Sequence, residues 1–389
     1  MFDIEREQSL SESVILAALY MPRKMDEELF EEDLAEMETL IATAGAEVAD
    51  IFVQKRDKPR FSTWFGAGKL DEISRRMKET NSKCLVIDAE LKPSQIQNIE
   101  AIICGKVIDR SQLILDIFAL HARTNEAKIQ VELAQLNLMY PRLTRMWSHL
   151  SRQSGGIGTR GPGETQLETD KRLVQKKIAQ LKKSLKKIKK SREVQRRGRS
   201  DTFRISLVGY TNVGKSTLLN ALCGADVLVR DELFATLDTA SKKGYIPSVG
   251  EVVISDTVGF LRKLPHHLVA SFRSTLEVAQ ETDLLLIVMD ASSKWFSHQL
   301  DTVRDVLGDL SAGHKPAKII FNKIDRVDDP LQLRQIECEF PQASFVSALD
   351  KESVQQLKHD LGETIHEVRA DKKQAAAIEK RAGTYIHVG

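Results

Sequence analysis

Short apolar runs alternate with amphipathic stretches through the first 110 residues of the chain. Four runs have the length and residue types of buried strands, at 14–20, 47–53, 84–89 and 105–110. Three stretches between them have the apolar spacing of helices, at 26–44, 69–80 and 93–103. Strands that alternate with helices in this way indicate a largely parallel sheet. We therefore expect an N-terminal α/β subdomain over residues 1–110.

From residue 111 the apolar positions recur every three or four residues, which is the period of helices that pack along a common seam. The first series is Ile129, Leu133, Leu136, Tyr140, Leu143, Trp147 and Leu150. The second series is Val174, Ile178, Leu181, Leu185 and Ile188. Two seams joined by one loop predict an antiparallel helical hairpin over 111–200 with a glycine-rich tip at 154–170, and two core helices of a larger bundle are the alternative. Pro141 lies inside the first seam, where we expect it to kink or interrupt the helix.

A third section begins at residue 201 with a strand-like run at 203–208, and a helix-like run follows at 217–222. Between them lies GYTNVGKS, residues 209–216, which fits G-x-x-x-x-G-K-[ST] in the strand–loop–helix context that this motif requires. The backbone N–H groups of such a loop bind phosphate oxygens. We expect Lys215 to reach the β- and γ-phosphates and the Ser216 hydroxyl to bind Mg²⁺.

Three further motifs follow in order and indicate which nucleotide binds. VISDTVGF at 253–260 supplies Asp256 for Mg²⁺ through water and the Gly259 N–H for the γ-phosphate. IIFNKIDR at 319–326 supplies Asp325, whose carboxylate can accept from N1–H and from the exocyclic amine of guanine, which adenine lacks. SAL at 347–349 fits the remaining guanine-side loop. This order predicts a Ras-like P-loop GTPase domain over 201–367, with an unrelated P-loop ATPase as the alternative.

Composition adds little until the distribution of charge is considered. The chain is 42% hydrophobic and 29% charged with a net charge of +2, which is ordinary for a globular protein. The second seam, however, carries a dense series of basic residues with Glu193 as the one acid among them. These are Lys171, Arg172, Lys176, Lys177, Lys182, Lys183, Lys186, Lys187, Lys189, Lys190, Arg192, Arg196, Arg197 and Arg199. Like charges at this spacing repel, so a polyanion is favoured over a solvated helix face. We therefore expect nucleic acid at this helix.

The whole chain resembles the HflX family of ribosome-associated GTPases, over roughly residues 14–350. Four stretches carry the resemblance: WFGAGKLDEI (64–73), VIDRSQLILDIFALHARTNEAKIQVELAQLNLMYPRL (107–143), GGIGTRGPGETQLETDKR (155–172), and LFATLD with DTVGFLRKLPHHLV (233–238 and 256–269). The resemblance implies an N-terminal α/β subdomain, a helical hairpin and then the GTPase domain. It also implies binding to the large (50S) ribosomal subunit, and several members are linked to splitting or rescuing stalled ribosomes under stress.

The resemblance also selects the threonine of the first switch. The stretch at 232–245 offers Thr236 and Thr239, and FATLD resembles the first switch of Obg-like and HflX-like GTPases, which favours Thr236. We expect Lys215, Thr236 and Gly259 to be catalytic, and Ser216 and Thr236 to bind Mg²⁺, with Asp256 acting through water. The nucleotide-binding residues expected are Gly209, Tyr210, Thr211, Asn212, Val213, Gly214, Lys215, Ser216, Thr217, Phe234, Ala235, Thr236, Asp256, Thr257, Val258, Gly259, Asn322, Lys323, Asp325, Ser347 and Ala348.

Two positions bear on the rate of hydrolysis. Phe260 follows Gly259 where many GTPases carry a glutamine that orients water, and phenylalanine cannot form that hydrogen bond. We therefore expect slow intrinsic GTP hydrolysis that a partner completes. Asn212 lies where some GTPases of this branch hold K⁺, so K⁺ is a second expected cofactor, and a turn residue tolerant of the local backbone is the alternative.

In the family, the hairpin tip reaches ribosomal RNA near the peptidyl-transferase centre. Glycines allow close approach of the backbone, so our RNA contact candidates are Gly156, Arg160, Gly161, Gly163, Lys182 and Lys186. The chain departs from the family where Thr239-Ala240 replaces Pro-Thr, and where 368–389 forms only a short C-terminal tail. GAGK at 66–69 is either a tight turn before a helix or part of an N-terminal ATP site.

The leading interpretation is a GTPase that binds the 50S subunit and couples GTP binding and hydrolysis to ribosome splitting or rescue. A large-subunit assembly factor is one alternative, and an RNA-binding protein with a mainly regulatory nucleotide site is another. Cys84, Cys104, Cys223 and Cys338 have no metal-site spacing, and no apolar run is long enough to span a bilayer. We expect a monomeric cytoplasmic protein without a signal peptide, and peripheral association with a membrane stays open.

Overall fold

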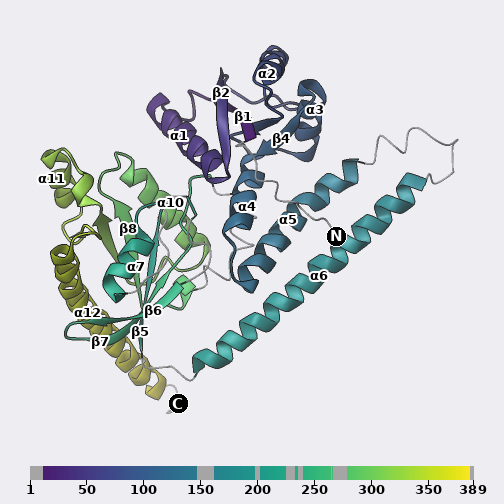
Figure 1. Cartoon of the computed structure of the whole chain (residues 1–389). Coiled ribbons are helices and arrows are strands. Elements are labelled where there is room, and N and C mark those ends of the chain that lie inside the picture. The colour runs from purple at the N-terminus through teal and green to yellow at the C-terminus, as the bar shows by residue number, and fades with distance from the viewer. Residues whose placement is uncertain are drawn as a thin grey trace. The chain divides into compact units, whose positions relative to one another are not determined.

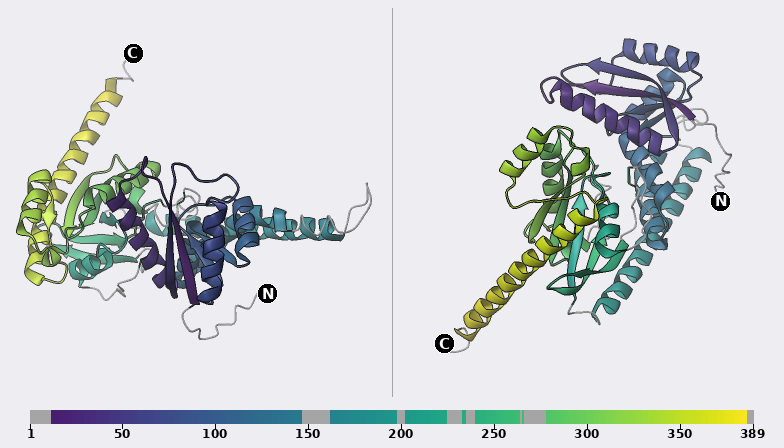
Figure 2. Two further views of the ribbon diagram at one scale, coloured as in Figure 1. Left: turned by 90° about the horizontal axis from the view of Figure 1, so that it is seen from above. Right: turned by 60° about the vertical axis from the view of Figure 1, so that its left-hand side comes forward.

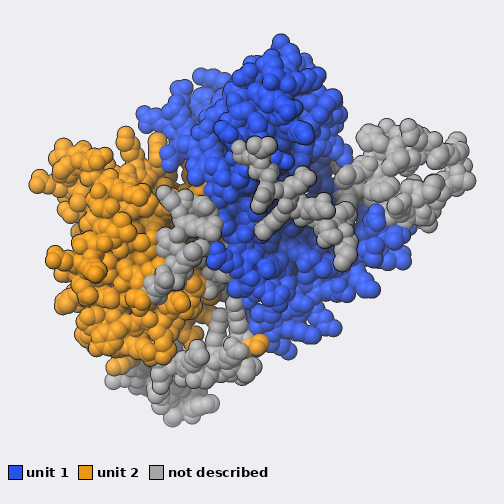
Figure 3. Space-filling view, in the orientation of Figure 1, with its two compact units in different colours: residues 1–190, 264–271 blue, residues 191–263, 272–389 orange. Residues whose placement is uncertain are grey.

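The computed structural model describes residues 12–146, 162–197, 202–224, 233–234, 240–263, 265 and 278–385. The chain divides into two compact units, one formed by residues 1–190 with 264–271 and the other by residues 191–263 with 272–389 (Figure 3). Figure 1 labels helices and strands of both units where there is room. Among the described residues, no helix combines the length and the apolar character that crossing a membrane requires.

The first unit contains the α/β subdomain that the alternating pattern predicts. Its elements are β1 (Glu12–Tyr20), α1 (Glu27–Thr43), β2 (Ala46–Lys55), α2 (Ala67–Glu79), β3 (Cys84–Ile87), α3 (Pro93–Ile103) and β4 (Lys106–Asp109). The strands form one sheet in the order β2-β1-β3-β4, and all three pairings are parallel. The predicted parallel sheet is therefore confirmed, with element boundaries within a few residues of those expected from the sequence.

The hydrophobic core explains why the strands differ in pattern. Central strand β1 is buried continuously from Val14 to Leu19, because helices cover both faces of a parallel sheet. Edge strand β2 instead has exposed residues between partly buried ones. Leu70, Ile73 and Met77 of α2 pack into the core cluster with the side chains of β1 and β3. The continuous apolar run and the broken one thus mark a central and an edge strand.

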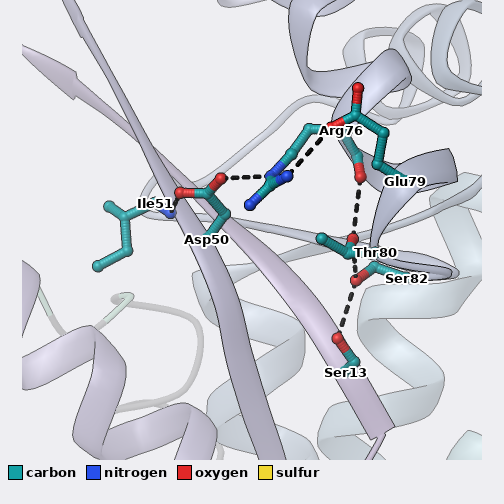
Figure 4. Close-up of polar contacts among 7 residues, drawn as sticks. All are labelled: Ser13, Asp50, Ile51, Arg76, Glu79, Thr80 and Ser82. Atoms are coloured by element: carbon teal, nitrogen blue, oxygen red, sulfur yellow. Dashed lines mark hydrogen bonds and ion pairs between the residues drawn. The ribbon is translucent and has the colours of Figure 1, made fainter.

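Polar contacts fasten α2 to this sheet (Figure 4). Arg76 Nε donates to Asp50 Oδ2 on β2 at 2.6 Å, and Arg76 Nη1 donates to Glu79 Oε2 at 3.0 Å. The hydrogen bond from Arg76 lowers the pKa of the Asp50 carboxyl below its ordinary value. Beyond the helix, the Ser82 hydroxyl lies 2.9 Å from that of Ser13 on β1. These contacts are partly exposed, so they fix orientation more than they add stability.

Three helices follow the sheet: α4 (Arg110–His121), α5 (Asn125–Met146) and α6 (Pro162–Arg197). Helices α5 and α6 run antiparallel and side by side (Figures 1 and 2). Two contacts join them: Gln175 Nε2 donates to the Tyr140 hydroxyl at 2.5 Å, and Lys177 Nζ lies 3.1 Å from Glu132 Oε1. The predicted helical hairpin is therefore confirmed.

Burial along α6 follows the predicted seam. Leu181 is buried, and the other seam positions are partly buried: Val174, Ile178, Leu185 and Ile188. On α5, Leu133 is buried, and the helix continues through Pro141 to Met146. The proline therefore does not interrupt the helix, contrary to one of the two expected effects. Leu143, Trp147 and Leu150 of the first seam lie among residues whose side chains the structure does not describe.

The structure also shifts the start of the second helix. Helix α6 begins at Pro162, so residues 162–170, which we expected in the glycine-rich tip, are helical. Proline suits the first turn because its fixed φ matches the helix and its missing N–H is not needed there. Gly163 consequently lies in the first turn of α6. The rest of the expected tip, 154–161, lies outside the described residues.

Buried charges attach the hairpin to the sheet. Arg142 on α5 reaches Asp109 at the end of β4, with Nη2 3.1 Å from Oδ2. Arg110, which follows Asp109 in the chain, is 2% exposed and forms ion pairs with Asp88 and Glu36. Removing one partner of a buried pair leaves an uncompensated charge and is strongly destabilising. The stretch at 107–143 that carries part of the family resemblance thus contains the residues that fix the hairpin on the subdomain.

The second unit has a six-stranded sheet in the order β10-β9-β8-β5-β7-β6. Its elements are β5 (Phe203–Gly209), α7 (Lys215–Cys223), β6 (Ala240–Ile246), β7 (Gly250–Asp256), β8 (Leu284–Asp290), α10 (Phe296–Asp309), β9 (Ala317–Asn322), the 3₁₀ helix η1 (Ile324–Arg326), α11 (Pro330–Glu339), β10 (Ser344–Phe345) and α12 (Lys351–Tyr385). Only the β6–β7 pairing is antiparallel among the pairings of these described strands. This is the expected α/β fold with a Ras-like P-loop domain.

The C-terminal helix is longer than the sequence led us to expect. Helix α12 reaches Tyr385, so most of the expected tail at 368–389 continues the helix. Buried residues recur along its first part at helical spacing: Val354, Leu357, Leu361, Ile365 and Val368. Further along, Lys372 pairs with Asp283 and lies over the Phe203 ring. The part of the helix that packs on the sheet thus extends a few residues past the expected domain boundary.

Candidate nucleotide-binding site

The P-loop, residues 209–216, connects the end of β5 to the start of α7. Gly214 has φ +88°, and a Cβ atom there would collide with the Asn322 side-chain amide. A Cβ atom on Gly209 would collide with the Val288 carbonyl oxygen on β8. Gly209 is therefore required because the β8 backbone lies close to it, and Gly214 because of its positive φ and the nearby Asn322 amide. The loop lies at the carboxyl ends of parallel strands, where ligands bind in open α/β sheets.

Lys215 is held inside the loop by its own backbone. Its Nζ donates to the Tyr210 carbonyl oxygen at 2.7 Å and to the Gly209 carbonyl oxygen at 3.2 Å. The residue is 6% exposed, and burial lowers the pKa of its ammonium from 10.5 to about 8, although Asp256 acts in the opposite direction. The charged form is thus disfavoured by desolvation, and a negatively charged ligand would restore it.

A pair of oxygen ligands faces the loop from two elements. Ser216 Oγ in the first turn of α7 lies 2.5 Å from Asp256 Oδ2 at the end of β7. Asp256 is fully buried, and the adjacent Thr257 donates from Oγ1 to the Leu207 carbonyl oxygen at 2.8 Å. A hydroxyl and a carboxylate oxygen are the hard ligands that Mg²⁺ prefers. The donor set therefore fits the expected magnesium ion.

The DxxG motif packs directly on the P-loop. A Cβ atom on Gly259 would lie 2.8 Å from Thr211 Cα and 3.0 Å from Lys215 Nζ, so only glycine fits. The next residue, Phe260, is 1% exposed, and its backbone forms a bridge to Tyr210. The Phe260 N–H donates to the Gly209 carbonyl oxygen at 3.0 Å, and the Thr211 N–H donates to the Phe260 carbonyl oxygen at 2.8 Å.

Asn322 connects the motifs that the sequence places far apart. Its Nδ2 donates to the Val213 carbonyl oxygen of the P-loop at 2.9 Å, and its Oδ1 accepts from the Ala348 N–H at 3.0 Å. Lys323, with φ 62°, forms an ion pair with Asp290 at 2.8 Å. Asp325 is exposed on η1, where its carboxylate is accessible to a base. The four ordered motifs therefore meet at one edge of the sheet.

Several expected residues are placed less completely. Ala235 and Thr236 lie outside the described residues, whereas Phe234 just before them is buried with φ 58°. Asn212 is exposed with φ 59°, a left-handed conformation that asparagine tolerates well. That backbone agrees with the turn interpretation of Asn212 and leaves the K⁺ interpretation open.

Two contacts at this site were not expected from the sequence. Asp290 ends β8 and pairs with Lys323, and its place after a continuous apolar strand was the one available signal. The Tyr210 hydroxyl oxygen accepts from the Arg262 N–H at 2.9 Å. Nothing in the local sequence indicates that contact, because the two residues are joined only by the fold.

In the first unit, the basic residues of α6 lie on an exposed face. Lys182 and Lys186, two of the RNA contact candidates, are exposed, as are Arg172, Lys176, Lys177, Lys183, Lys187, Lys189 and Lys190. No acid occurs between residues 171 and 191. The candidates Gly156, Arg160 and Gly161 lie outside the described residues.

Comparison with known proteins covers both units. One family model, described as "GTP-binding GTPase N-terminal", matches residues 31–119, and a second, "GTP-binding GTPase Middle Region", matches residues 121–199. A third, "50S ribosome-binding GTPase", matches residues 204–323. The boundary between the second and third models falls at the end of α6, where the chain enters β5.

Full-length relatives give the same result. A protein named GTPase HflX from Flavobacterium psychrophilum is 44% identical over 386 residues, which cover 94% of this chain and 93% of that protein. GTPase HflX from Escherichia coli K12 is 44% identical over 320 residues, covering 82% of this chain and 74% of that protein. Among solved structures, the complex of SsGBP with GDP has a TM-score of 0.50 at 25% identity, covering 92% of this chain and 99% of that one.

Proposed function

This chain belongs to the HflX family of GTPases, and from that premise we propose that it couples GTP binding and hydrolysis to the splitting or rescue of ribosomes through the large subunit. That the protein is a GTP-hydrolysing enzyme follows from the family and its GTPase domain. What we propose is the ribosomal role and its use under stress.

The basic face of α6 is the observation that carries the ribosomal role. Nine of its lysine and arginine side chains are exposed between residues 172 and 190, and the sequence places no acid among them. An isolated helix with this charge pattern repels itself, whereas RNA phosphates would neutralise it. The glycine-rich stretch precedes this helix in the sequence, so its backbone N–H groups and Arg160 would lie where the hairpin meets ribosomal RNA.

At the nucleotide, we assign roles according to position. The P-loop N–H groups would bind the phosphates, and the Lys215 ammonium would neutralise charge on the β- and γ-phosphates. Gly259 N–H would bind the γ-phosphate, while Asp325 would accept two hydrogen bonds from guanine. The alkyl stem of Lys323 would lie along the base, with its ammonium directed to Asp290. Phe260 offers no group to orient water, so we expect the ribosome or another group to complete hydrolysis.

Ser216, Asp256 through water and Thr236 would hold Mg²⁺, and Asn212 would hold K⁺. When bound, these cations neutralise negative charge that develops on the phosphates. The Ser216–Asp256 pair supports the magnesium assignment directly. We further propose that the protein acts as a monomer in the cytoplasm, where its ribosomal partner is found.

A GTPase assay with and without purified 50S subunits tests the proposal. We expect several-fold stimulation by 50S subunits in the full chain, and much less after deletion of residues 154–165. If the deleted protein still cosediments with 50S subunits, the tip acts on the ribosome; if binding is lost too, the tip anchors the protein. Equal GTPase rates with and without 50S subunits would contradict the proposal.

Sedimentation of intact ribosomes then separates the two ribosomal roles. Splitting predicts release of 30S and 50S subunits when the protein is added with a non-hydrolysable GTP analogue. An assembly factor would instead bind precursor particles and leave intact ribosomes whole. The matched control is the same protein with GDP, which should release fewer subunits.

A further inference from the structure

Tyr210 follows the first glycine of the P-loop, and its side chain reaches the polypeptide beyond the DxxG motif. The residue is 6% exposed, so the ring is buried. Its hydroxyl oxygen accepts a hydrogen bond from the Arg262 backbone N–H at 2.9 Å. The P-loop therefore supplies a side-chain acceptor to the segment after the DxxG motif, in addition to the backbone groups that bind phosphates.

Backbone hydrogen bonds hold the same segment on both sides of Phe260. Its N–H donates to the Gly209 carbonyl oxygen at 3.0 Å, and its carbonyl oxygen accepts from the Thr211 N–H at 2.8 Å. Three consecutive P-loop residues, 209–211, thus form hydrogen bonds with Phe260 and Arg262. We call residues 259–262 the docked segment.

The docked segment lies tightly against the phosphate-binding groups. A methyl carbon on Gly259 would lie only 3.0 Å from Lys215 Nζ and 2.8 Å from Thr211 Cα. When GTP binds, Lys215 Nζ and the Gly259 N–H both contact the γ-phosphate, so a phosphoryl group must fit beside them. The docked segment and the γ-phosphate of GTP therefore approach the same P-loop groups, whereas GDP has no γ-phosphate there.

We propose that Tyr210 is a positioning residue of the GTPase reaction: its hydroxyl stabilises the docked segment on the P-loop against the arrangement in which Gly259 binds the γ-phosphate. The hydroxyl thus sets how strongly the protein distinguishes GTP from GDP. The proposal rests on the GTPase activity and is independent of the ribosomal role.

Replacement of Tyr210 by phenylalanine tests the proposal, because it removes the acceptor oxygen and keeps the buried ring. One neutral hydrogen bond changes an equilibrium by about two- to tenfold. We expect the ratio of the GDP dissociation constant to that of a βγ-imido GTP analogue to rise by about that factor in Y210F. Calorimetry on the full chain with Mg²⁺ and no ribosomes measures both constants, so failure of the ribosomal proposal cannot affect the result.

The matched control is Tyr245→Phe, since Tyr245 lies on β6 and is 68% exposed. It should leave the ratio unchanged. If Y210F left the ratio unchanged, or weakened both nucleotides equally, the hydroxyl would have only a structural role and the proposal would be wrong.

A second variant, Arg262→Pro, removes the donor N–H and keeps Tyr210 intact. It should shift the ratio in the same direction, and the double variant should shift it no further than the larger single one, because both changes break one hydrogen bond. Additive shifts in the double variant would overturn the proposal, since they would mean that the hydroxyl and the N–H act separately.

Discussion

The nucleotide site and the basic arm, which is helix α6 with its exposed basic residues between 172 and 190, use polar groups in opposite ways. At the nucleotide site, Lys215, Asp256 and Asn322 are buried, and each has contacts at defined distances. Along α6, most of the described lysines are exposed and repeat at helical spacing, and Lys177 forms an ion pair with Glu132. One region depends on single atoms, and the other on the sum of many charges.

This difference determines how each region should respond to mutation. A buried group with fixed partners cannot be replaced by a neighbour, so one substitution should remove most of the function. Exposed charges at one helix face substitute for one another, so single changes should have small and similar effects. Comparing the loss of activity or affinity caused by single substitutions therefore tests whether one region depends on single buried groups and the other on summed charge.

The largest effect is expected from Lys215→Met, which keeps the volume of the side chain and removes the charge. We expect kcat/KM for GTP to fall by about 100- to 1,000-fold, because a preorganised charge at the phosphates is lost. The control is Lys243→Met on β6, whose side chain is 71% exposed and should leave the rate unchanged. Binding to ribosomal RNA without nucleotide should persist in K215M. A rate within tenfold of the unsubstituted protein would remove Lys215 from the catalytic set.

The next effect is expected from Asp325→Asn. Loss of two charge-assisted hydrogen bonds to guanine should weaken GTP binding by about 100-fold. Xanthosine triphosphate carries a carbonyl where guanine has the exocyclic amine, so the new amide should bind it better than GTP. Titration with GTP and with xanthosine triphosphate measures the change in preference. The control is Asp328→Asn, at an exposed neighbouring residue. Equal loss of both nucleotides in D325N would contradict the assigned role.

A smaller effect per residue is expected along the arm. Each of Lys182→Gln and Lys186→Gln should lower affinity for 50S subunits by about five- to eightfold near 0.1 M salt and reduce the salt slope by about 0.7–0.9. The matched controls are the same positions changed to arginine, which keeps the charge. Salt-insensitive binding, or one lysine whose loss abolishes binding, would show that the arm works by specific contacts instead.

The same contrast explains how much the sequence predicted. Elements such as β1 and α3 were predicted closely, because apolar period and burial coincide there. The motifs of the nucleotide site were found because spacing within each is fixed by phosphate and base geometry. The hairpin was found from its seam, but the helical start at Pro162 was missed, because glycines on both sides of that residue favour a loop.

What could not be predicted is contact between distant segments. Tyr210 meets Arg262, and Asn322 meets Val213, through the fold alone, and no periodic pattern reports such pairs. The helical continuation of α12 is different, because its alanine, lysine, glutamine and glutamate residues are good helix formers. Propensity summed over 368–385 favours a helix there, so the expectation of a short tail was wrong.

The smallest effect concerns the pH dependence of nucleotide binding, and it depends on the burial of Lys215 alone. In the protein without nucleotide, burial lowers the pKa of Lys215 to about 8. Bound nucleotide phosphates raise this pKa, because they stabilise the charged ammonium. Between these two pKa values the bound protein holds more protons than the free protein, so affinity must fall as pH rises above about 8. At pH 8, binding should take up about half a proton and be about twofold weaker than at pH 7.

Calorimetry in buffers of different ionisation enthalpy measures that uptake, which should increase from pH 7 to pH 8. The same linkage acts on folding without nucleotide. Because the folded pKa lies below the ordinary value of 10.5, the unfolded chain binds more protons between the two values, and the free energy of unfolding rises with pH there. In K215M that rise should disappear. Constant proton uptake across this range would mean that Lys215 is well solvated in the protein without nucleotide.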